Sequence, residues 1–316
     1  MTSIAVGLSA VIVAADASAP YVLATRHSGA VGLPHGRFDP DGDRTFELGL
    51  RNWVRAQTGF EPGYVEQLYT FGDRGREHPQ ADPDEAAPDA RLISVGYLGL
   101  TSERTEDSAF DAVWRSWYQF FPWEDHRDGR PPMIDAHIAP ALYKWSEHGP
   151  ASAARLDRAR MAFGLDDRPW IEERALERYE LLYEAGLAFE AMRDIGADSS
   201  STDGAFAGSG EPMISDHRRI LATAVGRLRG KIKYRPVIFE LMPETFTLSQ
   251  LQKVVEAVLG QALHKQNFRR ALDKSGLVEG TGTFETYTGG RPAELYRFRR
   301  DVQRERAALG VATPKA

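Results

Sequence analysis

The chain has 316 residues, of which 42% are hydrophobic and 27% charged. This balance is typical of a well-buried globular protein, and the length allows two domains. The chain contains no cysteine, which excludes disulfides, thiolate-bound zinc and a catalytic cysteine.

The net charge of −6 would by itself argue against a nucleic-acid partner, but the charge is unevenly distributed. From Asp216 to the end the chain carries 19 Lys and Arg against 10 Asp and Glu, a net charge of +9, and the preceding residues carry −15. The basic third is suited to bind a polyanion, while the acidic two-thirds favours solubility.

Strands and one helix are predicted in the first hundred residues. The apolar run of residues 4–15 is too short to span a membrane and has no basic flank, so we expect a buried strand and a cytoplasmic protein with no membrane partner. Residues 21–25, 64–71 and 92–100 have the composition of further strands. Residues 46–57 are expected to form a helix that ends at Gly59.

The middle of the chain is aromatic and then helical. The aromatic run of residues 114–123 is more typical of a core seam or a subunit interface than of an exposed stacking platform. Residues 134–196 follow a helical pattern, and residues 199–210 have the composition of a flexible linker. The eight His residues do not pair with carboxylates at ligand spacing, so we assign no metal site and no catalytic residue.

The last eighty residues predict two helices and a hairpin. Thr247 and Gln250 have the spacing of a capping box, and a helix with one buried face follows and ends at Gly260. A second helix covers residues 264–275, and strand-like residues 282–287 and 293–299 are joined by a glycine-rich turn. This order favours a winged helix-turn-helix over the simpler alternative, which is an amphipathic helical pair with a solvated basic face.

The expected DNA-binding residues lie at the start of the first helix, on the outer face of the second, and at the tip of the hairpin. Lys, Arg, Gln and Asn bind phosphates and the edges of guanine and adenine. The candidates are Thr247, Ser249, Lys265, Gln266, Asn267, Arg269, Arg270, Lys274 and Arg291.

The N-terminal pattern resembles a known family. The order of a strand, the loop LPHG, a helix ending in TGF, then QLYTFGD and RLISVGYLGL is similar to the Nudix fold. With the helical pair and the junction DHRRILATAVGRLRGKIKYRPVIFELMPETFTLSQLQ, the chain resembles Nudix-related bacterial transcriptional regulators that carry a C-terminal winged helix. The helical stretch before the junction makes the resemblance closest to the NadQ-type regulators of NAD biosynthesis.

The resemblance implies an α+β fold, in which a degenerate Nudix domain (an α/β/α sandwich) with a helical insertion is followed by a winged helix-turn-helix domain. The expected boundaries are residues 1–132 for the Nudix-like sensor domain, 133–212 for the insertion and linker, 213–235 for the closing helix and junction, and 236–316 for the DNA-binding domain.

The Nudix hydrolase pattern G-x5-E-x7-R-E-x2-E-E-x-G gathers carboxylates that hold Mg²⁺ against a pyrophosphate. Counted back from Gly59, the Arg-Glu positions hold Asn52 and Trp53, and the Glu-Glu positions hold Ala56 and Gln57. We therefore expect no hydrolysis. The alternative is a divergent Mg-dependent Nudix pyrophosphohydrolase acting on ADP-ribose or NAD, for which Glu47 with Asp41 or Asp43 would have to supply the metal ligands.

The resemblance further implies a repressor of NAD biosynthesis genes that senses NAD or a related adenine nucleotide, with NAD, ATP and ADP-ribose as effector candidates and no required cofactor. We expect a homodimer on a palindromic operator in double-stranded DNA, because one short helix reads too few base pairs. Arginines suit the effector's phosphates and aromatic rings suit its base, although alternation along a strand more often buries such rings. The ligand-binding candidates are Arg26, Arg37, Gln67, Tyr69, Phe71 and Arg76.

Overall fold

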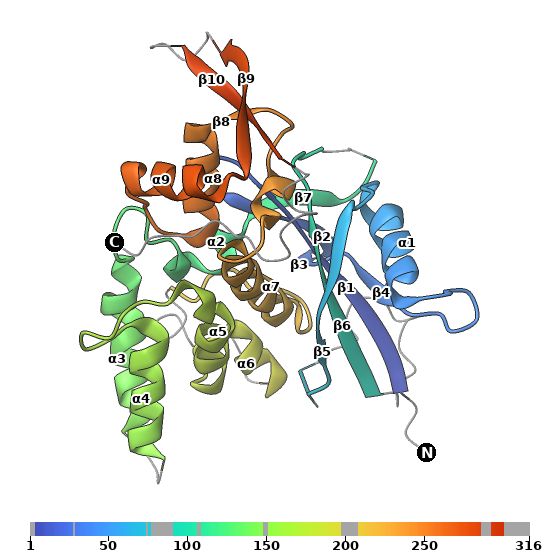
Figure 1. Cartoon of the computed structure of the whole chain (residues 1–316). Helices are drawn as coiled ribbons and strands as arrows, with labels where there is room; N and C mark the ends of the chain where they lie inside the picture. The colour runs from blue at the N-terminus through green and yellow to red at the C-terminus, as the bar shows by residue number, and fades with distance from the viewer. Residues whose placement is uncertain are drawn as a thin grey trace.

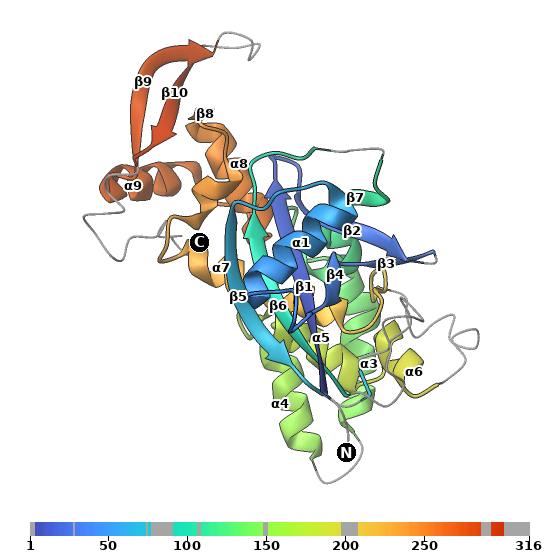
Figure 2. The ribbon, with the colours of Figure 1, turned by 90° about the vertical axis from the view of Figure 1, so that its right-hand side faces the viewer.

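A mixed β-sheet lies between α1 (Phe46–Thr58) on one side and α7 (His217–Ile232) with the remaining helices on the other (Figures 1 and 2). The computed structural model describes residues 4–27, 29–73, 75–76, 91–105, 109–147, 151–196, 208–285 and 292–299. No described helix is both long enough and apolar enough to cross a membrane.

The sheet is built around β1, which pairs in parallel with β6 from Ile4 beside Arg91 to Val13 beside Leu100. The other pairings within this sheet are antiparallel, and the strand order is β3-β2-β1-β6-β5, with β4 also paired to β1 and β7 to β2. The strands are β1 (Ile4–Ala15), β2 (Pro20–His27), β3 (Ala30–Gly32), β4 (His35–Arg37), β5 (Tyr64–Phe71), β6 (Arg91–Leu100) and β7 (Ala112–Ser116).

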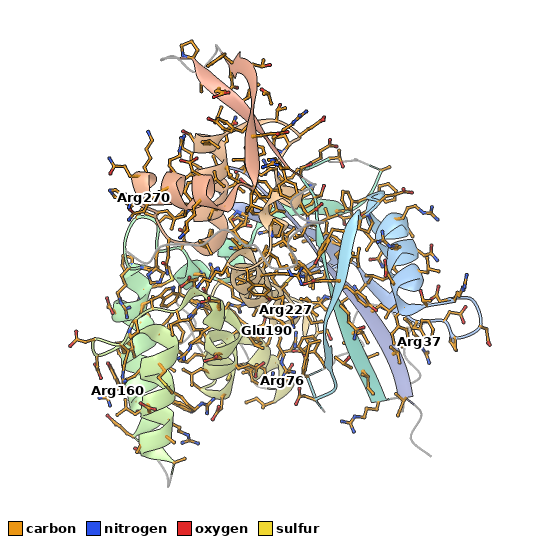
Figure 3. The ribbon with its side chains drawn as sticks, in the orientation of Figure 1. Arg37, Arg76, Arg160, Glu190, Arg227 and Arg270 are labelled. Carbon is orange, nitrogen blue, oxygen red and sulfur yellow. The ribbon has the colours of Figure 1, made fainter. Side chains whose placement is uncertain are left out.

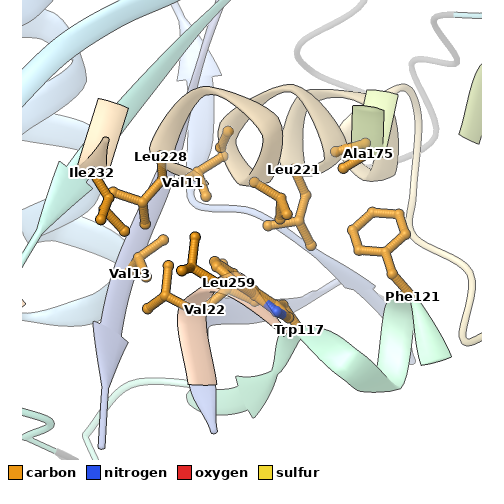
Figure 4. Packing of buried hydrophobic residues seen from close by; sticks show 14 of the residues in the cluster. Val11, Val13, Val22, Trp117, Phe121, Ala175, Leu221, Leu228, Ile232 and Leu259 are labelled. Carbon is orange, nitrogen blue, oxygen red and sulfur yellow. The ribbon is translucent and has the colours of Figure 1, made fainter. Parts of the chain in front are cut away.

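The apolar run of β1 supplies two cores at once, because successive side chains of a strand point to opposite faces. Leu8 and Ile12 pack with Leu50 and Val54 of α1. Val11 joins a larger cluster on the other face, which includes α7 and extends to the C-terminal helices (Figure 4). The expected strand and the expected helix at residues 46–57 are both confirmed.

Helix α1 has clear local signals at both ends. The hydroxyl of Thr45 accepts from the amide of Leu48 and caps the N-terminus. Gly59 closes the helix in the left-handed region at φ 67°, a conformation that glycine adopts without strain. At mid-helix Trp53 packs on Gly36 of β4 so closely that a Cβ there would overlap the indole ring.

The segment between the sheet and α7 is helical, as expected. Trp117, Phe120, Phe121 and Trp123 of the aromatic run are fully buried, so the run lies in the core and is no exposed stacking platform. The elements of this part are α2 (Trp117–Phe120), η1 (Pro122–Glu124), η2 (Ile134–Ile138), α3 (Ala139–Ser146), α4 (Ser152–Phe163), η3 (Glu172–Arg174), α5 (Ala175–Glu184) and α6 (Phe189–Asp194). The expected linker at residues 199–210 lies almost entirely outside the described residues.

The C-terminal part forms a winged helix-turn-helix. The capping box is confirmed, since Thr247 Oγ1 accepts from the amide of Gln250 at 3.1 Å and Gln250 Oε1 accepts from the amide of Thr247 at 2.6 Å. The elements are η5 (Val237–Leu241), β8 (Phe246–Thr247), α8 (Leu248–Leu259), α9 (Lys265–Ser275), β9 (Val278–Glu285) and β10 (Ala293–Phe298).

The hairpin differs from its prediction mainly at its start. Strand β9 begins at Val278, four residues before the predicted start, because Val278 pairs with Phe298 and Gly280 pairs with Tyr296. The short strand β8 was not predicted; it pairs with β10 and completes a three-stranded sheet. The turn at residues 286–291 lies outside the described residues.

A candidate nucleic-acid interface and a degenerate Nudix helix

Helix α9 presents a basic face to solvent. Phe268 and Leu272 point into the core, and their four-residue spacing turns the polar residues of the helix outward. Arg270 lies on the outer side of the helix (Figure 3). Of the DNA-binding candidates on α9, Lys265, Gln266, Arg270 and Lys274 are exposed, and Asn267 and Arg269 are half-buried.

Arg269 connects the two helices of the motif. Its Nη2 donates to Ser249 Oγ in the first turn of α8 at 3.1 Å, and its Nε is buried without a partner among the described atoms. The N-terminus of a helix attracts anions, because its first amides lack partners within the helix. Exposed Ser249 and the Arg269 guanidinium therefore mark one end of the basic face.

Two DNA-binding candidates remain, Thr247 and Arg291. The side chain of Thr247 is 5% exposed, and its hydroxyl is occupied by the cap of α8, so its side chain has a structural role here. Arg291, expected at the tip of the wing, lies outside the described residues.

The positions where a Nudix hydrolase carries carboxylates have other contacts in α1. The indole of Trp53 donates through Nε1 to the carbonyl of Arg37 at 3.0 Å. Gln57 holds the backbone of His35, donating to its carbonyl at 2.6 Å and accepting from its amide at 3.0 Å. These side chains tie the helix to β4, a role that the sequence did not reveal because the partners are 16 and 22 residues away.

The acids in the first turn of α1 and in the loop before it are engaged locally. Glu47 Oε1 accepts from Arg51 Nη2 at 2.9 Å, one turn further along α1. Asp43 Oδ2 accepts from the amide of Asp39 at 3.1 Å, and Asp39 Oδ1 accepts from the amide of Asp41 at 3.0 Å. Within the described ranges, no three His, Cys, Asp or Glu side chains gather in a group that could hold a metal ion.

The ligand-binding candidates do not form one cluster. Arg37 and Arg76 lie on opposite sides of the sheet (Figure 3). Arg26 of β2 pairs with Asp111 at 3.7 Å, and the side chains of Arg37 and Gln67 are exposed on β4 and β5.

At the end of β5 the structure brings three of the candidates into one region. Tyr69 is 62% exposed, and its ring meets the buried ring of Phe71 edge-on at 5.3 Å. Phe71 belongs to the core, as strand alternation favours, and Arg219 of α7 lies over its ring at 5.2 Å. Arg76 is bound to Glu180 of α5 at 2.9 Å, and Glu180 also pairs with Arg219 at 2.5 Å.

Arg219 also pairs with a buried carboxyl group, that of Asp216. Asp216 Oδ2 accepts from Arg219 Nη1 at 3.2 Å, and Asp73 pairs with the same nitrogen. Burial raises the pKa of Asp216 to about 7, and the neighbouring Glu180 acts in the same direction, although Arg219 and Arg76 oppose them. The sequence did not single out Asp216 or Arg219, because their partners beyond α7 come from two distant segments, residues 71–76 and α5.

Comparisons with known proteins agree with this architecture. Residues 238–298 match the model of the NrtR DNA-binding winged helix domain. A curated relative, the ADPR responsive transcriptional repressor NtrR of Acinetobacter baylyi (strain ATCC 33305 / BD413 / ADP1), is 45% identical over 86 residues, which are 27% of this chain. The aligned part spans about a third of that relative, 34% of its length.

Solved structures resemble the chain over nearly its whole length. Shewanella oneidensis NrtR complexed with a 27mer DNA has a TM-score of 0.56 and 20% identity, covering 98% of this chain and 99% of that one. A second crystal structure of the same protein has a TM-score of 0.54 and 21% identity, and the match covers 94% of this chain and 95% of that one. A MutT/nudix family protein from Enterococcus faecalis has a TM-score of 0.50 and 15% identity, and the match covers 95% of this chain and 88% of that one.

At these identities the structural likeness establishes the fold. The chain has a Nudix-like domain followed by an NrtR-type winged helix, and the resemblance to Nudix-related regulators with a C-terminal winged helix is confirmed. The narrower resemblance to NadQ-type regulators stays a prediction, as do the four domain boundaries.

Proposed function

We propose that the protein is a ligand-responsive, DNA-binding transcriptional repressor, in which the winged helix reads DNA and the Nudix-like domain senses a nucleotide. The observation that carries this proposal is the basic outer face of α9, within a segment that matches a DNA-binding winged helix domain. Helix α9 would enter the major groove, with Gln266 and Asn267 toward base edges and Arg270 and Lys274 toward bases or phosphates.

ADP-ribose is the effector that the proposal favours. The relative with 45% identity is named as ADPR responsive, and its likeness to this chain covers 86 residues. NAD and ATP remain alternatives from the sequence, and genes of NAD biosynthesis remain the expected targets. A ligand alters DNA binding only through a difference in its affinity for the DNA-competent and incompetent forms. We further propose a homodimer on a palindromic operator, because a single α9 covers too few base pairs for specificity.

We also propose that the Nudix-like domain does not hydrolyse its ligand. Trp53, Ala56 and Gln57 stand where the hydrolase pattern requires Glu, and Trp53 and Gln57 are engaged with β4. Glu47, the best acid for the rival hydrolase, is paired with Arg51. Mg²⁺-dependent release of a mononucleotide from ADP-ribose by the wild type, abolished in Glu47→Gln, would establish the rival.

A gel-shift titration tests the DNA-binding proposal. The full chain is titrated against promoter fragments of the NAD-synthesis genes from its own genome, and against coding fragments of equal length as the control. We expect specific complexes with one or a few promoter fragments, and a shift of their midpoints on adding ADP-ribose. Equal affinity for all fragments, unchanged by ADP-ribose, NAD or ATP, would contradict the proposal.

A further inference from the structure

A buried ion triad lies where four parts of the chain meet. Glu124 of η1 binds the guanidinium of Arg178 in α5 through two bonds of 2.5 and 2.8 Å, and it also pairs with Arg229 of α7. All three side chains are 0% exposed. One carboxylate thus faces two guanidinium groups, and all three side chains are shielded from bulk solvent.

The triad reaches the DNA-binding domain through the C-terminal end of α8. The last carbonyls of a helix have no partners within it, and a cation is favourable near them. Here Arg229 Nε donates to the carbonyl of Val258 at 2.9 Å, and the hydroxyl of Tyr118 donates to the carbonyl of Ala257 at 2.6 Å. Groups outside the winged helix therefore cap its first helix.

The turn after α8 is fitted to the same place. The amide of His126 donates to the carbonyl of Gly260 at 2.7 Å. Gly260 has φ 69°, and a Cβ there would overlap the carbonyl oxygen of Glu124. Leu259 packs in the same core as α7 and the strands (Figure 4). The contact between the two parts is thus close packing together with directed hydrogen bonds.

The helical insertion completes the arrangement. The carbonyl of Glu172 accepts from Arg178 Nη2 at 3.2 Å and from Arg229 Nη1 at 3.0 Å. Its carboxylate accepts from Gln261 Nε2, in the turn between α8 and α9, at 3.4 Å. Backbone carbonyls take up guanidinium donors that the single carboxylate leaves unsatisfied, and such donors are costly to bury unpaired.

Helix α7 links this place to the candidate ligand region. Arg219, near its N-terminal end, contacts Phe71 and pairs with Asp73 and Glu180. Arg229 follows ten residues later on the same helix, about 15 Å along its axis. A shift of α7 at the sensor end would reach α8 through Arg229.

We infer that Glu124 is a positioning residue, which through Arg178 and Arg229 holds the winged helix in a fixed place on the sensor domain. This gives the helical insertion a role, since it supplies Arg178 and the Glu172 carbonyl. The inference rests on the proposed function only for its effect on DNA binding. The docking itself is measurable without DNA.

The test compares Glu124→Gln with Glu190→Gln in the full chain. Glu190 forms a second buried ion pair, with Arg218 at 3.1 Å, and its other oxygen accepts from the amide of Met213, so this control removes a buried charge away from α8. Hydrogen exchange is followed in two segments, residues 124–130 and 256–263. In Glu124→Gln we expect exchange there to accelerate at least about tenfold over the control, because an opened contact exposes these amides.

DNA affinity is measured on the same samples. We expect Glu124→Gln to bind operator DNA about tenfold more weakly than Glu190→Gln, because the winged helix loses its fixed orientation. Exchange in the two segments that is equal in both variants would overturn the inference, even if DNA binding is established. A wild type that binds no DNA would overturn the proposed function, and the exchange comparison would still decide the inference.

A milder variant covers the case in which Glu124→Gln does not fold. Tyr118→Phe removes the hydroxyl that caps Ala257 and interacts with Arg229, and it leaves the Glu124–Arg178 pair in place. We expect exchange at residues 256–263 to accelerate by several-fold at most, because one hydrogen bond is lost. Exchange in α1 should be unchanged. Unchanged exchange at residues 256–263 would overturn the inference, because the C-terminal end of α8 would then not depend on its contacts with Tyr118 and Arg229.

Discussion

Gln57 binds both backbone groups of His35, accepting from its amide at 3.0 Å and donating to its carbonyl at 2.6 Å. Gln57→Glu restores the acid of the hydrolase pattern but removes the donor, so a carboxylate would face a carbonyl. We expect the free energy of unfolding to fall by about 1–3 kcal/mol. Ala56→Glu, which adds an exposed acid on the same helix, is the control and should change stability little. Urea unfolding of both variants measures the difference, and equal stability would show that the Gln57 bonds contribute nothing.

Arg270→Ala should weaken operator binding by roughly tenfold and flatten the dependence of log affinity on log salt by about one unit, because the exposed guanidinium faces DNA in the proposed complex. The control is Arg168→Ala, which removes an exposed arginine of the insertion, 56% of whose side chain is accessible. Fluorescence anisotropy at several salt concentrations measures both slopes. Identical slopes for the two variants would remove Arg270 from the interface.

Arg269→Ala should weaken DNA binding and also loosen the motif, which distinguishes it from Arg270→Ala. Its guanidinium bonds Ser249 at 3.1 Å and is half-buried, so truncation removes a contact between α8 and α9 as well as a charge. We expect a loss of stability of about 1 kcal/mol for the bond and its packing. Thermal unfolding of both arginine variants checks this. A wild-type melting temperature for Arg269→Ala would assign Arg269 to DNA binding alone.

Asp216 should make the stability depend on pH in an unusual direction. Burial raises its pKa from 3.8 to about 7 in the folded protein, despite the nearby Arg219 and Arg76 and together with Glu180. The contribution of Asp216 to the free energy of unfolding is fully present below pH 4 and is lost as pH rises through 7, because the carboxyl group loses its proton at a lower pH in the unfolded chain than in the folded protein. Asp216→Asn should therefore gain stability relative to the wild type between pH 4 and 7, by at most about 4 kcal/mol. A difference between the two proteins that does not vary with pH would contradict the raised pKa.

Local signals in the sequence were sufficient for the elements that depend on them. The Thr247 and Gln250 capping box, the helix end at Gly59 and the buried face of α8 follow from neighbouring residues, and the structure has each of them. The start of β9 was misplaced because Gly280 is a weak strand former and only pairing with β10 sets the boundary.

The candidate site was predictable only where one helix carries it. The outer face of α9 follows from the spacing of Phe268 and Leu272. The bonds of Gln57 to β4 and of Glu124 to Arg229 span 22 and 105 residues, and no periodicity reveals such partners. The ligand candidates were chosen by residue type, and the structure places Phe71 in the core and Arg76 in an ion pair.

We propose that the Nudix-like domain senses a nucleotide without consuming it, and that the winged helix responds. In the decisive experiment labelled operator DNA is titrated with the protein, with Mg²⁺ present and with or without ADP-ribose, and the ADP-ribose that remains is measured by chromatography. We expect the DNA affinity to change on adding ADP-ribose, with the nucleotide recovered intact. An unchanged DNA affinity together with conversion of ADP-ribose to a mononucleotide would contradict the claim and establish a hydrolase.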